Sequence, residues 1–136
     1  MMDFAAARRM MVDGQIRTAD VTDLRLVAAM LDVARERFVP HVKAALAYLD
    51  FDLPVTPDVR EGDARCLLKP VVLAKMIQAA DVEEGDNVLD LGCATGYSAW
   101  NSRRHSSWKR FGPTTCLTSP SRVISARKSA DHGIGE

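Results

Sequence analysis

The stretch Asn87-Val-Leu-Asp-Leu91, followed directly by Gly92-Cys-Ala-Thr-Gly96-Tyr97, decides the fold that we expect for this chain. A short apolar run predicts a buried strand. Gly92 permits a tight turn after the strand, and Gly96 lets the backbone pass close to a ligand. A helix that begins near Tyr97 would offer free N–H groups to an anionic group. By itself the spacing fits either a nucleotide-type binding turn or an ordinary strand–turn–helix connection. The dinucleotide fingerprint is absent, because Ala94 stands where its second glycine would be.

The residues upstream of this stretch predict helices and one loop. Asp3 is placed to cap a short helix that stops at Gly14. A second helix starts at Thr22 or Asp23 and ends before Pro40, and another begins at Pro70. Residues 41–49 are expected to be helical, 54–65 a loop and 65–69 extended. The apolar stripes that these two helices should bury are Leu24, Val27, Ala28 and Leu31, and Leu73, Met76, Ile77 and Ala80.

The composition is that of a folded protein of one domain. Of the 136 residues, 47% are hydrophobic and 26% are charged, which excludes disorder of the whole chain. Nothing resembles a membrane span or a signal peptide. The three cysteines, Cys66, Cys93 and Cys116, have the spacing of neither a metal site nor a disulfide framework. We therefore expect a cytoplasmic protein without a membrane partner and without a metal.

The zero net charge hides a division of the chain into two parts. Residues 1–100 hold 11 Lys and Arg against 16 Asp and Glu, whereas residues 101–136 hold 7 against 2. The second part is also rich in serine and poor in large aliphatic residues. We expect residues 1–99 to be the N-terminal part of a domain, with a helical extension, a first strand and the glycine loop. Residues 100–136 are expected to be a basic Ser/Arg-rich tail, aberrant or disordered.

Several ordered segments carry a resemblance to a known family. Residues 82–97 (VEEGDNVLDLGCATGY) look like motif I of the class I S-adenosylmethionine-dependent methyltransferases. Upstream, the segments that begin at Met11 (MVDGQI), Val33 (VARERFVP), Ala47 (AYLD) and Leu53 (LP) follow in the order and spacing of the protein-L-isoaspartate O-methyltransferases. The chain therefore resembles the N-terminal half of that family over roughly residues 10–99.

The resemblance implies an α/β fold, namely a Rossmann-like, doubly wound sheet with an N-terminal helical extension. It implies methyl transfer from S-adenosylmethionine, the cofactor, to the carboxylate of an isoaspartyl residue in a damaged protein or peptide, the partner. It assigns no catalytic residue, and it places Asp90 near the methionine end of the cofactor. The residues that would form the cofactor loop are Asp90, Gly92, Cys93, Ala94, Gly96 and Tyr97.

The sequence also departs from the family. A Thr-Ile-Ser-x-Pro segment that contacts the substrate is usual there, whereas the matching place here, Cys66–Pro70, keeps the proline and has no hydroxyl; Ala34 also replaces a usual proline. Residues 92–130 contain no Asp or Glu to bind the cofactor ribose. We therefore expect an incomplete fold, little or no stabilisation by S-adenosylmethionine, and an inactive, truncated chain whose tail is read out of frame. The alternatives are a non-enzymatic fragment and a methyltransferase-like protein with a different substrate.

Three further features have a plain interpretation and a functional one. Cys93 is expected to fill space in the loop rather than to act as a nucleophile, since no base is near it in the sequence. His41 is expected at the surface. The basic segment from Arg103 to Arg110 could hold a nucleic acid through phosphate contacts, but solvated disorder is the better interpretation, and we expect no nucleic-acid partner.

Overall fold

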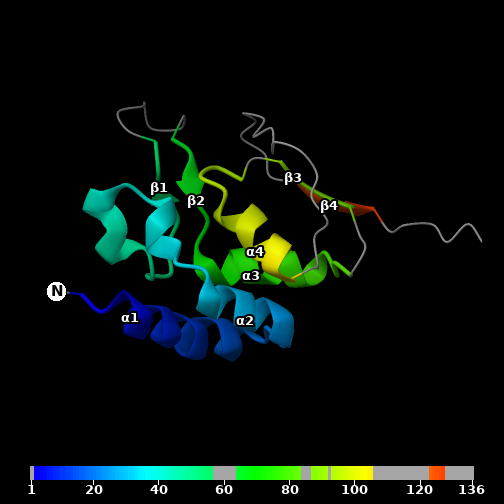
Figure 1. Cartoon of the computed structure of the whole chain (residues 1–136), viewed down its shortest axis with the longest axis horizontal. Coiled ribbons are helices and arrows are strands. Elements are labelled where there is room, and N and C mark those ends of the chain that lie inside the picture. The colour runs from blue at the N-terminus through cyan, green and yellow to red at the C-terminus, as the bar shows by residue number, and fades with distance from the viewer. Residues whose placement is uncertain (1, 57–63, 84–86, 92, 106–122, 128–136) are drawn as a thin grey trace, which may run out of the picture.

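A computed structural model describes residues 2–56, 64–83, 87–91, 93–105 and 123–127 (Figure 1). These residues form a group of helices with two small antiparallel sheets beside it. This mixed arrangement is compatible with a methyltransferase fold. The helices and helical turns are α1 (Phe4–Met11), η1 (Val12–Ile16), η2 (Arg17–Ala19), α2 (Leu24–Asp32), η3 (Arg35–Phe38), η4 (His41–Leu46), α3 (Pro70–Ala79) and α4 (Tyr97–His105). The strands are β1 (Leu53–Pro54), β2 (Cys66–Leu67), β3 (Asn87–Leu91) and β4 (Val123–Arg127).

The first helix begins as expected but does not stop at Gly14. The carboxylate of Asp3 accepts hydrogen bonds from the amides of Ala5 and Ala6, both 3.0 Å long, and so caps α1. The chain then continues through a π-helical turn, η1, which contains Gly14. Val12 and Ile16 are fully buried in this turn, and their packing outweighs the low helix propensity of glycine.

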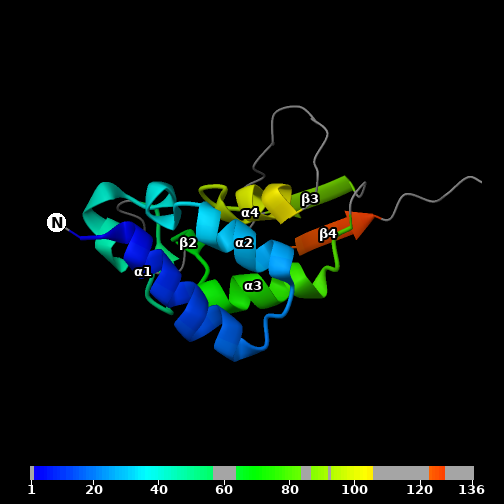
Figure 2. The same cartoon turned by 60° about the horizontal axis from the view of Figure 1, so that its bottom comes forward.

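The second helix is capped by Asp23, as expected, but it buries a different face. Asp23 accepts hydrogen bonds from Arg25 and Leu26. Leu24 is 74% exposed, whereas Leu26 is fully buried. The expected stripe is wrong for Leu24 and Ala28, which are exposed, whereas Val27 is buried and Leu31 is partly buried against the core. The buried face differs because α2 packs against η1, α3 and α4 at once (Figure 2). The buried residues of α2 are Leu26, Val27, Ala29 and Met30.

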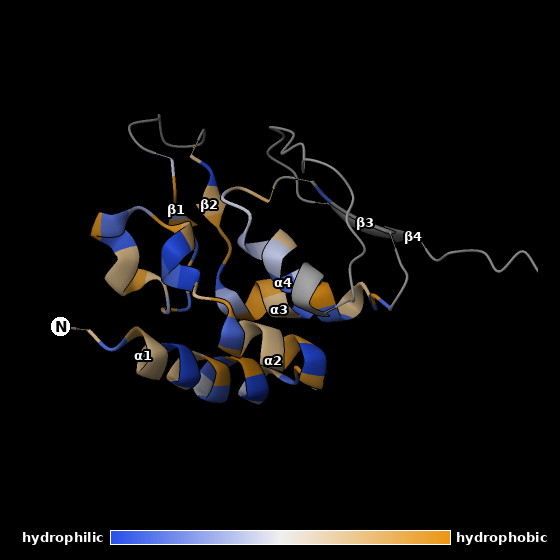
Figure 3. Cartoon of the chain, in the orientation of Figure 1, coloured by the Kyte–Doolittle hydropathy of each residue, from blue (hydrophilic) through white to orange (hydrophobic). Residues whose placement is uncertain are grey.

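The middle of the chain follows the expected order. α3 begins at Pro70 and buries Leu73 and Ile77, while Met76 and Ala80 are half-buried. Residues 41–46 are helical, but as a 3₁₀ helix. The loop expected over residues 54–65 connects two short strands, β1 and β2, which pair antiparallel with each other. Residues 57–63 lie outside the described residues. Figure 3 shows that α3 carries mostly hydrophobic residues, in keeping with its place against the other helices.

The strand before the glycine loop is confirmed, and its pairing differs from the expected one. β3 pairs antiparallel with β4, so that Asn87 lies opposite Arg127 and Leu91 opposite Val123. A doubly wound sheet would have placed a parallel strand beside β3. The sequence of β4 includes the β-branched residues Val123 and Ile124, which favour a strand, and a strand edge is a template for any extended segment.

The last described helix crosses the boundary that we expected near residue 99. α4 continues to His105, and both Asn101 and Ser102 are buried. The side-chain amide of Asn101 donates to the carbonyl of Tyr97 at 2.8 Å, and Ser102 Oγ donates to the carbonyl of Ser98 at 3.0 Å. Residues 100–105 and 123–127 thus have regular structure, unlike the expected tail; residues 106–122 and 128–136 lie outside the described part. No described helix is long and apolar enough to span a membrane.

Candidate cofactor-binding loop

The loop between β3 and α4 is a closed turn. Asp90, next to last in β3, is only 6% exposed, and Cys93 is buried. The amide of Gly96 donates to the carbonyl of Cys93 at 2.8 Å, and the amide of Trp100 donates to the carbonyl of Gly96 at 2.9 Å. These bonds connect the turn directly to the first turn of α4.

Two residues of the loop have a left-handed backbone. The φ angle of Ala94 is 50° and that of Gly96 is 94°. This region suits glycine and is costly for a residue with a Cβ, so Gly96 meets the requirement and Ala94 is strained. A Cβ placed on Gly96 would meet no atom within 4 Å. The backbone at Gly96 therefore faces open space, as a loop that approaches a ligand requires.

The first turn of α4 holds buried polar atoms. Ser98 is 2% exposed, and its Oγ has no hydrogen-bond partner among the described residues. The Oδ1 atom of Asn101 is likewise buried without a partner there. Buried polar groups are normally paired, so these atoms require an explanation. The Ser98 hydroxyl can donate to an anionic group such as a carboxylate, as can the amides of a helix N-terminus, whereas Asn101 Oδ1 can only accept and would require a donor.

Tyr97 anchors the start of α4 in the core. Its ring is fully buried and meets the ring of Phe38 edge to face, with centroids 5.4 Å apart and planes at 66°. The guanidinium carbon of Arg35 lies 4.7 Å from the centre of the Tyr97 ring. Burial raises the pKa of Tyr97, and the nearby charge of Arg35 opposes that rise.

Arg35 is a buried charged residue that contacts Tyr97. Its side chain is 0% exposed, and it donates from Nε to the carbonyl of Ala47 and from Nη2 to the carbonyl of Leu68, both at 2.6 Å. The sequence contains no signal for this burial, because arginine is normally a surface residue and no apolar stripe includes position 35. The sequence likewise contains no signal for the burial of Ser98 and Asn101.

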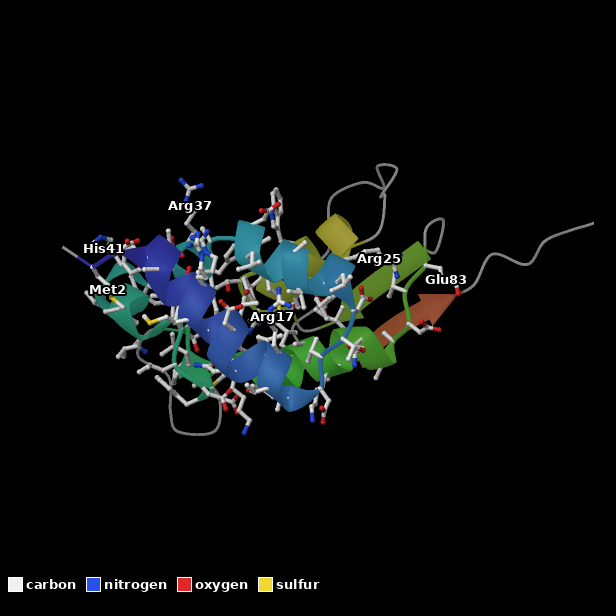
Figure 4. All side chains as sticks on the ribbon, turned by 90° about the horizontal axis from the view of Figure 1, so that it is seen from below. Met2, Arg17, Arg25, Arg37, His41 and Glu83 are labelled. Carbon is white, nitrogen blue, oxygen red and sulfur yellow. The ribbon has the colours of Figure 1, made fainter. Side chains whose placement is uncertain are left out.

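The structure brings together Asp90, Cys93, Ala94, Gly96 and Tyr97 in one turn; Gly92 lies outside the described residues. The assignment of these residues to a cofactor stays a prediction. Cys93 is buried, and His41, labelled in Figure 4, is exposed. Within the described part of the chain, no His, Cys, Asp and Glu side chains are grouped to hold a metal ion.

The segment where the family usually has hydroxyl residues is largely packed inward. Leu67 is buried, and it pairs with Leu53 of β1. Cys66 is half-buried, and its thiol points to the carbonyl of Ala64 at 3.8 Å. Lys69 is fixed through its amide, which donates to the carboxylate of Asp52 at 2.8 Å. The segment thus offers a thiol and apolar groups in place of two hydroxyls.

Comparison with known proteins identifies the family. A sequence model of the protein-L-isoaspartate(D-aspartate) O-methyltransferases matches residues 6–103. The chain is 40% identical over 92 residues to protein-L-isoaspartate O-methyltransferase 2 of Anaeromyxobacter sp., a match that covers 68% of this chain and 35% of that protein. It is 38% identical over 96 residues to protein-L-isoaspartate O-methyltransferase 1 of Rhodopseudomonas palustris, covering 71% and 37%. A third relative, from Geobacter metallireducens, is 37% identical over 98 residues, covering 72% and 43%.

The matched region contains most of α1, the elements from η1 to β3, the loop and most of α4. The chain belongs to the protein-L-isoaspartate(D-aspartate) O-methyltransferase family. The match spans between 35% and 43% of the length of these three relatives.

Proposed function

We propose that this chain takes part in methyl transfer from S-adenosylmethionine to the isoaspartyl carboxylates of proteins, and that its glycine loop receives the methionine end of the cofactor. The observation that carries the proposal is the turn from β3 to α4, with an open backbone at Gly96 and, beside the helix N-terminus, a buried Ser98 hydroxyl that has no hydrogen-bond partner among the described residues. The proposal includes the finer fold assignment, in which β3, the loop and α4 are the first unit of a Rossmann-like sheet.

The residues of the loop fit the methionine end of the cofactor. The amide groups at the N-terminus of a helix such as α4 suit its carboxylate. Asp90, at the end of β3, suits its ammonium group, and the absence of a side chain at Gly96 allows close approach. When bound, the cofactor would supply a methyl group on a positively charged sulfur. The residues 92–130 hold no acidic side chain for the ribose, so we expect weak binding that depends mainly on the methionine end.

Methyl transfer to a carboxylate requires no proton transfer by the protein. A carboxylate is already a nucleophile at pH 7; its oxygen bonds to the methyl carbon as the carbon–sulfur bond breaks. The protein must therefore align the two groups and exclude water. In this chain the loop and α4 would hold the donor in place. No described side chain is required as a general base.

A specific observation favours a second candidate, a substrate other than an isoaspartyl peptide. Cys66, Leu67 and Leu68 stand where the family usually has hydroxyl residues for the substrate. Leu67 is buried and cannot contact a peptide without a rearrangement. If methyl transfer takes place, the acceptor would then be recognised by apolar contacts and by Lys69.

An NMR titration tests the cofactor proposal. S-adenosylmethionine should shift the amide signals of residues 93–98 in a saturable way, and free methionine should shift the same signals. Adenosine, which lacks the methionine part and carries no charge, should leave them unchanged. If S-adenosylmethionine produces no saturable shift in the loop, the cofactor proposal is wrong.

An assay with labelled methyl groups tests the transfer step. Two peptides of one sequence, with isoaspartate and with ordinary aspartate, are compared. We expect no turnover by these 136 residues alone, because the ribose carboxylate is missing from residues 92–130. Turnover of the isoaspartyl peptide would establish the activity in this chain and contradict that expectation. Turnover of both peptides would favour the second candidate.

A further inference from the structure

Arg35 connects three segments that are far apart in the sequence. Its Nε atom donates to the carbonyl of Ala47, which follows η4, and its Nη2 atom donates to the carbonyl of Leu68, which lies between β2 and α3. Its guanidinium group also lies over the ring of Tyr97, the first residue of α4. One side chain thus joins the helical extension to the glycine loop.

These contacts hold a charge that is costly to bury. The guanidinium stays protonated at any ordinary pH, and Arg35 is fully inaccessible to solvent. A buried charge is strongly destabilising when a group that compensates it is lost. The carbonyl oxygens and the negative face of the Tyr97 ring are such groups. Displacement of the ring would therefore leave the charge less stabilised, so Arg35 resists movement of Tyr97.

The turn that carries Arg35 holds the ring from a second side. Phe38, in the same turn η3, meets the Tyr97 ring edge to face. Tyr97 directly follows Gly96, whose amide and carbonyl close the loop through Cys93 and Trp100. The Tyr97 ring is thus held at the point where the loop ends and α4 begins.

We infer that Arg35 is the positioning residue for the glycine loop: through the ring of Tyr97 it orders the left-handed turn at residues 94–96 and the N-terminus of α4. Its effect on cofactor affinity rests on the proposed function. Its effect on the order of the loop does not, and the two are measured separately.

Hydrogen exchange in the full chain measures the order of the loop without a ligand. In Arg35→Met, the protection of the Gly96 and Trp100 amides should fall about tenfold more than that of the Val27 amide, as expected for the loss of a buried cation–π contact. The Val27 amide donates to the carbonyl of the cap residue Asp23 at the start of α2 and serves as the reference amide outside the loop. Equal changes at all three amides would show a merely structural role and overturn the inference.

Two matched variants serve as controls. Arg37→Met removes an arginine from the same turn, whose side chain points into solvent (Figure 4). Arg8→Met removes a partly buried arginine that bonds to Tyr48, to the carbonyl of Leu31 and to Glu36 of η3, so it also tests whether any loss of a contact with this turn disturbs the loop. Neither should lower the protection of the loop relative to Val27. A relative loss of the same size in either control would contradict a specific role for Arg35.

Variants of the ring keep the inference testable if Arg35→Met fails to fold. Tyr97→Phe retains the ring face and should retain the protection of Gly96 and Trp100, whereas Tyr97→Leu should lose it. Arg35→Lys keeps a charge over the ring and should restore part of the protection. Equal protection in Tyr97→Phe and Tyr97→Leu would overturn the inference.

A measurement of S-adenosylmethionine affinity separates this inference from the proposed function. S-adenosylmethionine should bind Arg35→Met about tenfold more weakly than the parent chain, since the ordered loop must first be formed. If the parent chain binds no S-adenosylmethionine while Arg35→Met still loses loop protection, the proposed function fails and the positioning role stands. Equal affinity and equal loop protection in both chains would overturn the positioning role.

Discussion

The side chain of Gln78 holds the backbone of Asp23, the residue that caps α2. Its Oε1 atom accepts hydrogen bonds from the amides of Thr22 and Asp23, at 2.8 and 3.0 Å, and its Nε2 atom donates to the carbonyl of Asp20 at 3.2 Å. Asp20 has a left-handed backbone, with φ of 60°. A residue of α3 therefore fixes the turn by which the chain enters α2.

Replacement of Gln78 by alanine should weaken this connection. The variant loses three hydrogen bonds to backbone, one of them part-buried, and we expect the free energy of unfolding to fall by about 1–2 kcal/mol. Urea unfolding followed by circular dichroism measures the change. Lys75→Ala on the same helix, at an exposed position, should change it by less than about 0.5 kcal/mol. Equal stability of Gln78→Ala and the parent chain would contradict the role of this contact.

The buried face of α2 can be tested with two leucines. Leu26 is fully buried and Leu24 is 74% exposed, although the sequence pattern favours Leu24 as a core residue. Leu26→Ala should cost about 2–5 kcal/mol of unfolding free energy, whereas Leu24→Ala should cost less than about 0.5 kcal/mol. Thermal and urea unfolding measure both. A reversed order would restore the stripe expected from the sequence.

Alanine substitutions at Gly14 and Gly96 distinguish the effect of backbone strain from the effect of steric fit. A Cβ on either Gly14 or Gly96 would meet no atom within 4 Å, but only Gly96 has a left-handed backbone, with φ of 94°. Gly96→Ala should therefore lower the free energy of unfolding by about 1–2 kcal/mol. Gly14→Ala, within a helical turn, should raise it by about 0.5–1 kcal/mol. Changes of the same sign in both variants would rule out this explanation.

Ala94 offers the opposite experiment in the same loop. Its φ of 50° is costly for alanine and free for glycine, so Ala94→Gly should stabilise the protein by roughly 0.5–1 kcal/mol. Ala28→Gly, at an exposed site within α2, should instead destabilise it by about 1 kcal/mol. Denaturant midpoints report both effects. A destabilised Ala94→Gly would show that the methyl group makes contacts worth more than the strain.

The two tyrosines of the chain should both resist ionisation. Burial, together with the hydrogen bond that Tyr48 donates to Glu36, raises the pKa of Tyr48 from 10.0 to about 12, and burial also raises the pKa of Tyr97. An unfolded tyrosine loses its proton near pH 10. Between there and pH 12 the unfolded state therefore holds fewer protons than the folded state, and the free energy of unfolding falls as the pH rises.

An absorbance titration of tyrosinate checks this expectation. The folded protein should show little tyrosinate near pH 10. Tyr48→Phe should lessen the loss of stability between pH 10 and pH 12 and leave the contribution of Tyr97 in place. Full ionisation of two tyrosines near pH 10 in a chain that remains folded would contradict the burial of these side chains.

Local signals in the sequence determined the beginnings of the elements and the loop. Asp3, Asp23 and Pro70 mark the starts of α1, α2 and α3 because a cap or a proline acts on the few residues beside it. The apolar run before Gly92 predicts β3, and the glycines predict the turn, for the same reason. The order of segments also identified the family, which the comparisons confirm.

Only the tertiary structure decided which side chains are buried and which strands pair. The buried face of α2 depends on the elements around it, and the passage of the chain through Gly14 depends on the core that Val12 and Ile16 enter. The antiparallel partner of β3 comes from residues far along the chain. Arg35 is charged and would be placed at the surface by any local rule. It is buried because carbonyl groups and an aromatic ring from three distant segments meet around it, and no property of its neighbours in the sequence contains that information.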